Sequence, residues 1–330
     1  METLLSLYDP APSPLLSELL DTPPLRRLAE VGMNCGCEYT AFSRFARTLP
    51  YSRRDHSAGA ARIVWHFTAS PAQAAAALLH DVATPVFAHT VDFLHGDHLR
   101  QESTEADTAA VIAASPEVTA VLARYGLEAA DVGDYHRYPI ADNDSPRLSA
   151  DRLEYTLGNL FHYGFEDLPR LGAFYRDLTV SAGEEGQAEL AFRTPEIAQD
   201  FALAALRTGG VYVSDEDRFA MEALAALLRD ALDRGVLTPA DLMGTEPAVI
   251  TKLRSDAVSG AAWDRFRRFH AIRTAKTRPE EGFWVRVDAK RRWIDPLAVG
   301  RGRVSAWSTV FREALGDFLA LDFTRWLSTD

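Results

Sequence analysis

The chain has 330 residues and a formal net charge of −12 at pH 7, with 47% hydrophobic and 25% charged residues. This balance is typical of a globular protein that forms one large domain, or a core with a substantial appendage. An acidic chain repels nucleic acid phosphates at long range, so we expect no nonspecific binding to duplex DNA, although a local basic pocket stays compatible with this charge.

The two cysteines, Cys35 and Cys37, are separated by a single residue. They are too few for a zinc knuckle of their own, and a disulfide between them would be strained. We therefore expect two reduced thiols. No apolar run reaches the roughly 18 residues that a membrane span requires, and the N-terminus lacks a signal pattern. The sequence predicts a cytoplasmic protein that does not enter a membrane.

The first half of the chain carries helical signals, with short helices expected over 13–20 and 24–32 and a partly buried helix over 53–67. Ser70-Pro71 is a helix start, because serine caps helices and proline is favoured at the first helical position. The nearly all-apolar run that follows, 72–79, is typical of a helix in the middle of a core. It leads directly into His80 and Asp81.

Later elements follow the same logic. Ser115-Pro116 starts another helix, 139–147 reads as a loop, and a helix over 148–163 carries Asp151. Beyond about 177 we expect a hairpin (178–180 with 189–192), helices over 194–208 and 215–234, a second hairpin (283–287 with 292–294) and a last amphipathic helix over 305–327. The prediction is a mainly α fold with one or two small β-hairpins, because no alternating βα series appears. We place a boundary between a helical core, 1–170, and a mostly helical C-terminal region packed on it, 171–330.

The pair His80-Asp81 at the end of an apolar helix needs an explanation. A buried carboxylate costs several kcal/mol unless it is paired or metal-bound, and the alternative is a helix end that simply meets water. His56 lies on the preceding helix, and two antiparallel neighbouring helices can bring such positions together. With Asp151, two imidazoles and two carboxylates form a mixed N/O ligand set that does not choose among Mn²⁺, Fe²⁺, Zn²⁺, Mg²⁺ and Ni²⁺ or Co²⁺.

The order His…His-Asp…Asp resembles the signature of the HD-domain superfamily of metal-dependent phosphohydrolases. The resemblance extends to four segments, which together cover about residues 50–165. Residues 53–59 (RRDHSAG) resemble the R-x-x-H-S-x-G segment, and 78–82 (LLHDV) resemble L-L-H-D-[IV]. Residues 85–89 (PVFAH) and 151–155 (DRLEY) resemble the P-x-F-[SGA]-H and D-[RK]-x-[DE]-Y segments of the deoxynucleotide triphosphohydrolase branch.

This resemblance implies an HD-domain helical core and a set of site residues. One divalent metal ion would be held by His56, His80, Asp81 and Asp151, and a second metal is compatible with the superfamily. His89 and Asp92, three residues apart and thus on one helix face, would line the pocket and help with proton transfer. Arg53, Arg152 and Tyr155 would hold phosphate oxygens or ribose.

Residues 101–105 (QESTE) allow two interpretations. A serine or threonine there could cap the next helix, with acids complementing its dipole. Alternatively Glu102 or Glu105 reaches the pocket as a general base or as a partner of a metal ligand. His98 and His136 fall between the His-Asp pair and Asp151, the interval from which a two-metal HD site takes its extra ligands.

One departure from the triphosphohydrolase pattern stands out. Many of those enzymes read H-D-x-G-H, whereas residues 80–84 here read HDVAT. Thr84 cannot act as an acid or base near neutral pH, which argues against triphosphohydrolase activity specifically. The segment instead resembles an uncharacterised bacterial subgroup of HD proteins.

The expected function is hydrolysis of a small phosphorylated metabolite, foremost a nucleotide (dNTP, NTP or nucleoside monophosphate), by an enzyme for which a homo-oligomer is plausible. Three alternatives stay open. They are a non-catalytic metal and nucleotide sensor, a dinuclear-iron HD oxygenase that would need two further histidine ligands, and an assembly protein that uses its C-terminal half as an interface.

Overall fold

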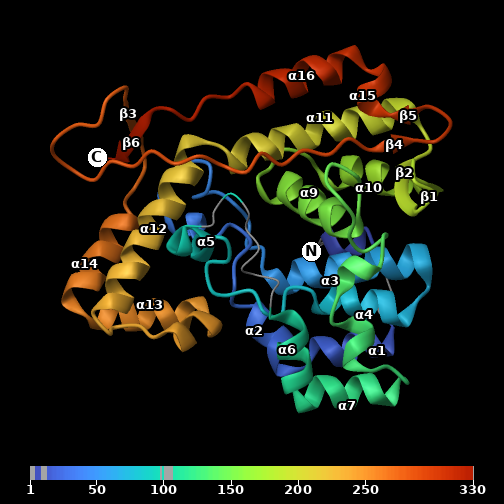
Figure 1. The fold of residues 1–330 in the computed structure, drawn as a ribbon, viewed down its shortest axis with the longest axis horizontal. Helices are drawn as coiled ribbons and strands as arrows, with labels where there is room; N and C mark the ends of the chain where they lie inside the picture. The colour runs from blue at the N-terminus through green and yellow to red at the C-terminus, as the bar shows by residue number, and fades with distance from the viewer. Residues whose placement is uncertain (1–3, 9–12, 97–98, 100–106, 330) are drawn as a thin grey trace.

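The structure is a computed structural model that describes residues 4–8, 13–96, 99 and 107–329. Helices dominate it (Figure 1). The α-helices are α1 (Pro14–Leu20), α2 (Pro23–Leu28), α3 (Arg53–Thr68), α4 (Pro71–Leu79), α5 (Thr90–His95), α6 (Thr108–Ala114), α7 (Pro116–Arg124), α8 (Ala129–Val132), α9 (Ala150–His162), α10 (Leu168–Arg176), α11 (Pro195–Tyr212), α12 (Asp215–Asp233), α13 (Glu246–Ser255), α14 (Ala257–Phe266), α15 (Val304–Trp307) and α16 (Thr309–Leu319). Short 3-10 helices are η1 (Leu4–Ser6), η2 (Cys37–Tyr39), η3 (Tyr135–Arg137) and η4 (Pro239–Met243).

The strands form two small sheets, so the predicted mainly α class is confirmed. The strands are β1 (Leu178–Ala182), β2 (Ala188–Phe192), β3 (Ile272–Ala275), β4 (Leu297–Ala298), β5 (Gly302–Arg303) and β6 (Trp326–Thr329). β1 and β2 form the first predicted hairpin, with Leu178 opposite Phe192, and the sheet order is β1-β2-β4-β5. β3 and β6 pair separately as an antiparallel sheet.

Three helices, α3, α4 and α9, form the part of the core that carries the site. α3 begins at a capping box in which Ser52 and Asp55 bond each other's backbone N–H, a local signal that fixes where a helix starts. α4 begins at the Ser70 cap, and its residues from 74 to 79 are all buried. Because α3 packs against both α4 and α9, side chains at the ends of these helices converge.

Two hydrophobic clusters make up the interior. One surrounds α3, α4 and α9 and extends to α11, α15 and α16. The other is built around α12 and includes side chains from α13 and α14 together with Phe42, Phe87 and Leu327. Both clusters combine residues from either side of position 170, where we expected a boundary. The division into 1–170 and 171–330 stays a prediction.

Two expectations for the C-terminal half are wrong. Residues 283–287 and 292–294 do not pair as a hairpin, since Val285 bridges to Leu327 instead. The last helix ends at Leu319, and residues 326–329 form β6 against β3. In both cases alternating apolar residues find their partners far away in the chain, which a local pattern does not reveal.

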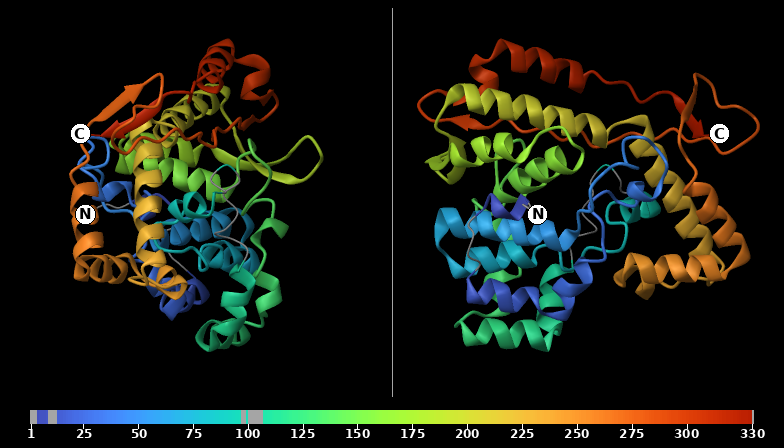
Figure 2. Two further views of the ribbon diagram at one scale, coloured as in Figure 1. Left: turned by 60° about the vertical axis from the view of Figure 1, so that its left-hand side comes forward. Right: turned by 180° about the vertical axis from the view of Figure 1, so that it is seen from behind.

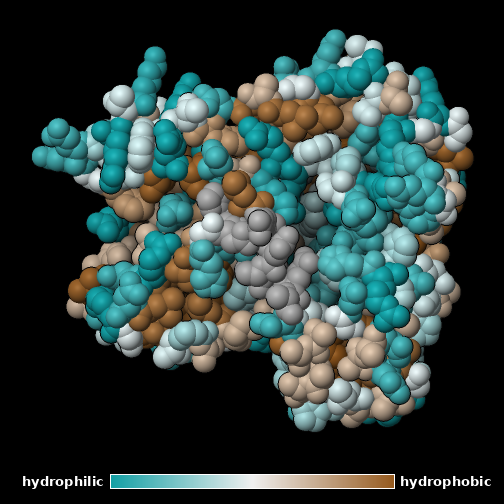
Figure 3. All heavy atoms as spheres, in the orientation of Figure 1, coloured by the Kyte–Doolittle hydropathy of each residue, from teal (hydrophilic) through white to brown (hydrophobic). Residues whose placement is uncertain are grey.

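Residues 284–296, which we call the strap, run as an extended segment across the molecule. Figures 1 and 2 show this orange stretch passing alongside α11 on its way to β4. The space-filling view shows hydrophilic side chains over much of this face, with apolar ones gathered in separate patches, one of them over α16 (Figure 3). Among the described residues, no helix combines the length and apolar character that crossing a membrane demands.

Candidate metal centre

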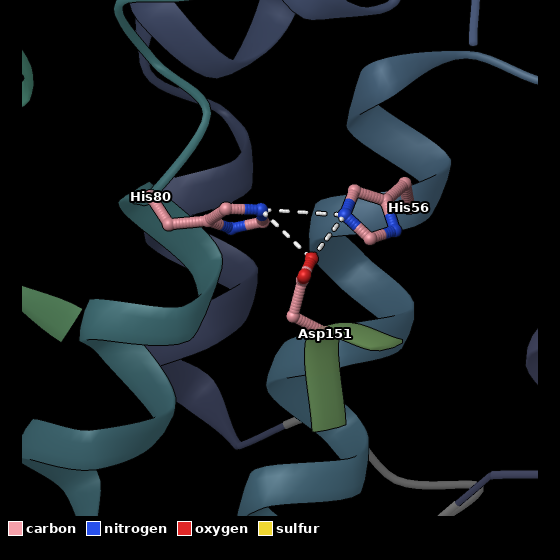
Figure 4. Close-up of side chains that lie close together, drawn as sticks. All are labelled: His56, His80 and Asp151. Carbon is pink, nitrogen blue, oxygen red and sulfur yellow. Dashed lines mark hydrogen bonds and ion pairs between the residues drawn. The ribbon is translucent and has the colours of Figure 1, made fainter. Parts of the chain in front are cut away.

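Side chains from three helices meet at one point. His56 comes from α3, His80 from the C-terminal end of α4 and Asp151 from the first turn of α9, and their ligand atoms all lie within 4.8 Å of one another. His56 Nε2 is 3.3 Å from His80 Nε2 and 3.0 Å from Asp151 Oδ1, and His80 Nε2 is 3.5 Å from the same oxygen (Figure 4). The helix packing thus gathers three of the four predicted metal ligands.

Hydrogen bonds on the far side of each ring set the orientation of both histidines. Nδ1 of His80 donates to the carbonyl oxygen of Ala77 at 2.8 Å, and Nδ1 of His56 donates to Glu154 Oε2 at 2.6 Å. A neutral ring with its proton on Nδ1 would present its Nε2 lone pair to Asp151. Three electron-pair donors that converge in this way repel one another unless a positive charge lies between them. Two imidazoles and a carboxylate are a donor set that fits a divalent ion of the Mn²⁺, Fe²⁺ or Zn²⁺ type.

The electrostatics of the cluster favour a positive charge at the same point. Burial alone would lower the pKa of His56, but hydrogen bonds to Asp151 and Glu154 outweigh it and raise that pKa to about 10. Burial opposes ionisation of Asp151, yet its hydrogen bonds with His56 and His80 hold its pKa well below the usual range. A proton held at His56 and a metal ion would therefore compete for one site.

Asp81, the fourth predicted ligand, lies beside the three-residue cluster. Its Oδ2 is 3.7 Å from His80 Nε2 and 4.0 Å from His56 Nε2. The same oxygen accepts from Arg53 Nη1 at 3.1 Å, while Thr84 Oγ1 donates to Oδ1 at 2.7 Å. Burial works against the charge on Asp81, but the neighbouring Arg53 lowers its pKa. Asp81 is thus an ionised carboxylate within reach of the cluster, and its ligand role stays a prediction.

His89 and Asp92 form a hydrogen-bonded pair at the cleft. His89 Nδ1 donates to Asp92 Oδ2 at 2.9 Å, and Asp92 is fully buried behind the histidine. Burial lowers the pKa of His89, which leaves the ring neutral near pH 7 with its other nitrogen available to a reacting group. Phe87 and Ala88, just before it, have positive φ values of 58° and 42°, a left-handed backbone that surrounding structure must hold in place.

The other predicted site residues have different positions. Tyr155 lines the cleft beside the cluster. Arg152 turns away from it, since Nε donates to the Arg147 carbonyl at 2.7 Å and the guanidinium pairs with Asp142 at 3.1 Å. Its predicted phosphate contact has no support from this geometry and stays a prediction. Glu102, Glu105 and His98 lie outside the described residues.

His136, a candidate ligand of a second metal ion from the sequence, lies at the surface. Its Nδ1 is 2.8 Å from Asp142 Oδ2, and 52% of its side chain is exposed. Within the described parts of the chain, His56, His80 and Asp151 are the group of three or more metal-binding side chains that lie close enough together to share an ion. The second metal stays a prediction.

The cluster opens into a cleft with about 1120 Å³ of empty space, a volume that includes space open to solvent. Several lining residues belong to none of the motifs, namely Asn34, Cys35, Tyr135, Asn159, Tyr163, Tyr212, Asp217, Lys290 and Arg292. They come from distant segments, so only the fold brings them together. Glu154 is different, because it follows Asp151 by three residues on the same helix and its role behind His56 could have been inferred from that spacing.

No family model matches the chain, but known proteins resemble it in sequence. The uncharacterized protein YdhJ of Bacillus subtilis is 24% identical over 245 residues, which cover 73% of this chain and 71% of that protein. The metal-dependent phosphohydrolase cns2 of Cordyceps militaris is 26% identical over 151 residues, 46% of this chain and 42% of the fungal protein.

A solved structure extends the likeness to the whole fold. The crystal structure of a phosphohydrolase from Bacteroides thetaiotaomicron covers 96% of this chain and 95% of its own, with a TM-score of 0.62 and 15% sequence identity. At that identity the match establishes the fold alone. The structural match includes the C-terminal half of the chain, where no motif lies.

Proposed function

We propose that this chain is a metal-dependent phosphohydrolase of the HD-domain type, which its motifs, its fold and its histidine–aspartate cluster support. The metal would be held by His56, His80 and Asp151, with Asp81 as the fourth ligand. The substrate would be a small phosphorylated metabolite, and the finer proposal is a nucleotide. The names of the fungal relative and of the Bacteroides structure support the reaction class.

The observation that carries this proposal is the convergence of three electron-pair donors. His56 Nε2, His80 Nε2 and Asp151 Oδ1 face one another while each ring's Nδ1 is already bonded. The His136–Asp142 pair differs, because the side chain of His136 is half exposed and the pair belongs to no group of three metal-binding side chains among the described residues. A divalent ion in the cluster would act as a Lewis acid on a phosphoryl oxygen.

The chain's own residues supply the rest of the chemistry. Arg53 is buried against Asp81 and lines the cleft, where its charge favours a phosphate. His89, fixed through Nδ1 by Asp92, presents Nε2 as the nitrogen that takes a proton from water or gives one to the leaving oxygen. These two groups line the same cleft as the metal ligands.

The tyrosines of the cleft suit the uncharged portion of a nucleotide. Aromatic rings of Tyr155, Tyr163 and Tyr212 line the cleft, and such rings provide flat apolar surfaces with a polar tip. Asn159 donates to the Tyr212 hydroxyl at 2.7 Å, and its buried Oδ1 has no partner. A base or sugar that donates a hydrogen bond would satisfy it after a small side-chain movement.

A screen for product release tests the proposal. The protein is incubated with dNTPs, NTPs, nucleoside monophosphates and cyclic nucleotides in the presence of Mn²⁺, Fe²⁺, Co²⁺ or Mg²⁺. We expect metal-dependent release of phosphate, or of a larger phosphate fragment, by the wild type and none by His80→Ala. Metal and nucleotide binding without any turnover would instead favour the sensor, and oxygen consumption with two irons would favour the oxygenase. The homo-oligomer and the cytoplasmic location stay proposals.

A further inference from the structure

The strap brings positive charge to the cleft from the opposite end of the sequence. Ala289, Lys290 and Arg292 line the same cleft as the metal ligands, which all come from residues 56–151. Within the described parts of the chain, the lysine and arginine residues that line this cleft are Arg53, Lys290 and Arg292. Arg53 is already bonded to Asp81. The strap thus carries two of the three lysine and arginine residues that line the cleft in the described part of the chain.

Contacts on both sides hold the strap in position. Arg218 is almost fully buried and donates to the Val287 carbonyl at 2.5 Å. Val285 and Leu327 exchange two backbone hydrogen bonds at 2.9 and 2.7 Å. At the other end, the Asp295 N–H donates to the Pro146 carbonyl at 2.9 Å. A segment anchored at both ends presents its side chains at a defined place.

A glycine in α11 lets the strap come close at its centre. A Cβ at Gly209 would lie 2.6 Å from the carbonyl oxygen of Arg292, whereas a Cβ at its neighbour Gly210 would meet nothing within 4 Å. Real Cβ atoms do not approach backbone oxygens that closely. The position of the Arg292 backbone therefore depends on the absence of a side chain at Gly209.

The charge of Arg292 acts on the cleft. Burial is the main cause of the lowered pKa of His89, and the positive charge of Arg292 lowers it further. Burial raises the pKa of Tyr155, and Arg292 opposes that rise. Arg292 thus lies within electrostatic reach of the proton-transfer residue and of a tyrosine beside the metal cluster.

We propose that Lys290 and Arg292 of the strap bind a second anionic group of the substrate, apart from the phosphoryl group that reacts. The inference rests on the proposed phosphohydrolase function and narrows its substrate class to molecules with at least two anionic groups, such as nucleoside di- and triphosphates. A metal ion and Arg53 suffice for one phosphate, whereas two further cations in the same cleft match additional negative charge. The strap residues determine specificity, and they take no part in proton transfer.

The test compares three adjacent strap cations in the metal-loaded, full-length protein. Arg291 is the matched control, because its guanidinium donates to the Leu321 carbonyl at 2.6 Å and it is not among the cleft-lining residues. Pyrophosphate binding is measured by calorimetry. We expect Lys290→Ala and Arg292→Ala each to weaken it about 10- to 100-fold, the scale of one charged hydrogen bond, and Arg291→Ala to leave it within about twofold.

Two glycine variants test the position of the strap independently. Gly209→Ala should weaken pyrophosphate binding, as Lys290→Ala and Arg292→Ala do, while Gly210→Ala on the same helix should leave it unchanged. In turnover assays, Arg292→Ala should raise KM for a nucleoside diphosphate more than for the monophosphate. If the wild type does not bind pyrophosphate, or if Arg292→Ala and Arg291→Ala bind it equally, the inference is wrong even when phosphate esters are hydrolysed. If binding behaves as expected but nothing is hydrolysed, the inference stands and the proposed phosphohydrolase function fails.

Discussion

Glu154 Oε2 lies 2.6 Å from Nδ1 of His56, which makes this buried glutamate the group that aims the histidine at the metal cluster. Glu154 also accepts hydrogen bonds from the Tyr51 and Tyr8 hydroxyls. A carboxylate held by two tyrosines has little freedom to move. The orientation of His56 is therefore built into the packing of α3 against α9 and the N-terminal segment.

Replacing this glutamate should weaken metal binding without removing a predicted ligand. We expect Glu154→Ala to lower metal affinity about 10- to 100-fold, as loss of a partner behind a ligating histidine typically does. A competitive chelator titration gives the measurement. Glu166→Gln is the control, because Glu166 pairs with Arg207 near the end of the same helix. Equal affinities for the two variants would show that Glu154 does not orient His56.

Thr84 provides a second test, since it occupies the position where a catalytic histidine was expected. Its side chain is fully buried, and its hydroxyl donates to Asp81 Oδ1 at 2.7 Å. Thr84→Val keeps the shape but removes the donor, so we expect a loss of about 1–3 kcal/mol in the free energy of unfolding. Thr84→Ser should retain most of the stability in a urea titration. If Thr84→Val were as stable as Thr84→Ser, the hydrogen bond from Thr84 to Asp81 would not stabilise the fold.

We expect substitutions of His89 and Asp92 to affect turnover but not metal binding. His89→Ala should lower kcat about 10²- to 10⁴-fold, the usual contribution of a general acid or base, while the metal content stays at the wild-type level. Asp92→Asn should change the pH profile of kcat, because it alters the partner of His89 Nδ1. His270→Ala, at an exposed position, is the control. A His89→Ala enzyme with unchanged kcat would exclude this residue from proton transfer.

We expect the buried carboxyl of Asp217 to make the free energy of unfolding depend on pH. Burial raises the pKa of this carboxyl from 3.8 to about 8, so the folded chain keeps a proton that the unfolded chain loses. The stabilisation is complete below about pH 4, and it declines as the pH rises towards 8, by at most about 1.4 kcal/mol per pH unit. Asp217→Asn stays neutral throughout and should flatten this decline.

Urea denaturation across that pH range measures the effect. Asp233→Asn replaces an exposed aspartate at the end of the same helix and should reproduce the wild-type slope. Parallel slopes for wild type and Asp217→Asn would rule out a neutral Asp217 in the folded protein.

The approach of His56 and His80 could be predicted because it follows from sequence features close to each residue. Ser52 and Ser70 fix the starts of α3 and α4, and an all-apolar α4 must be central. The ends of these helices then hold His56 and His80 close together. Arg152 follows Asp151 directly and therefore points about 100° away around the helix, so its phosphate contact stays a prediction.

The remainder of the cleft depends on contacts between distant segments. Asp217 lies on α12 and Arg292 on the strap, and neither neighbourhood has a motif. The strap reaches the cleft through Gly209 and Arg218, whose importance becomes apparent only once the chain is folded. For the same reason the second expected hairpin was misassigned, because Val285 pairs with Leu327 across the sequence.

The central claim is that His56, His80 and Asp151 hold a divalent metal ion. Elemental analysis of the purified full-length protein, with the variants His80→Ala, Asp151→Ala and His136→Ala, tests it most directly. His136 also pairs with an aspartate but lies outside the cluster. We predict a bound divalent ion in the wild type and in His136→Ala, and its loss in the other two variants. Wild-type metal content in His80→Ala and Asp151→Ala would contradict the account.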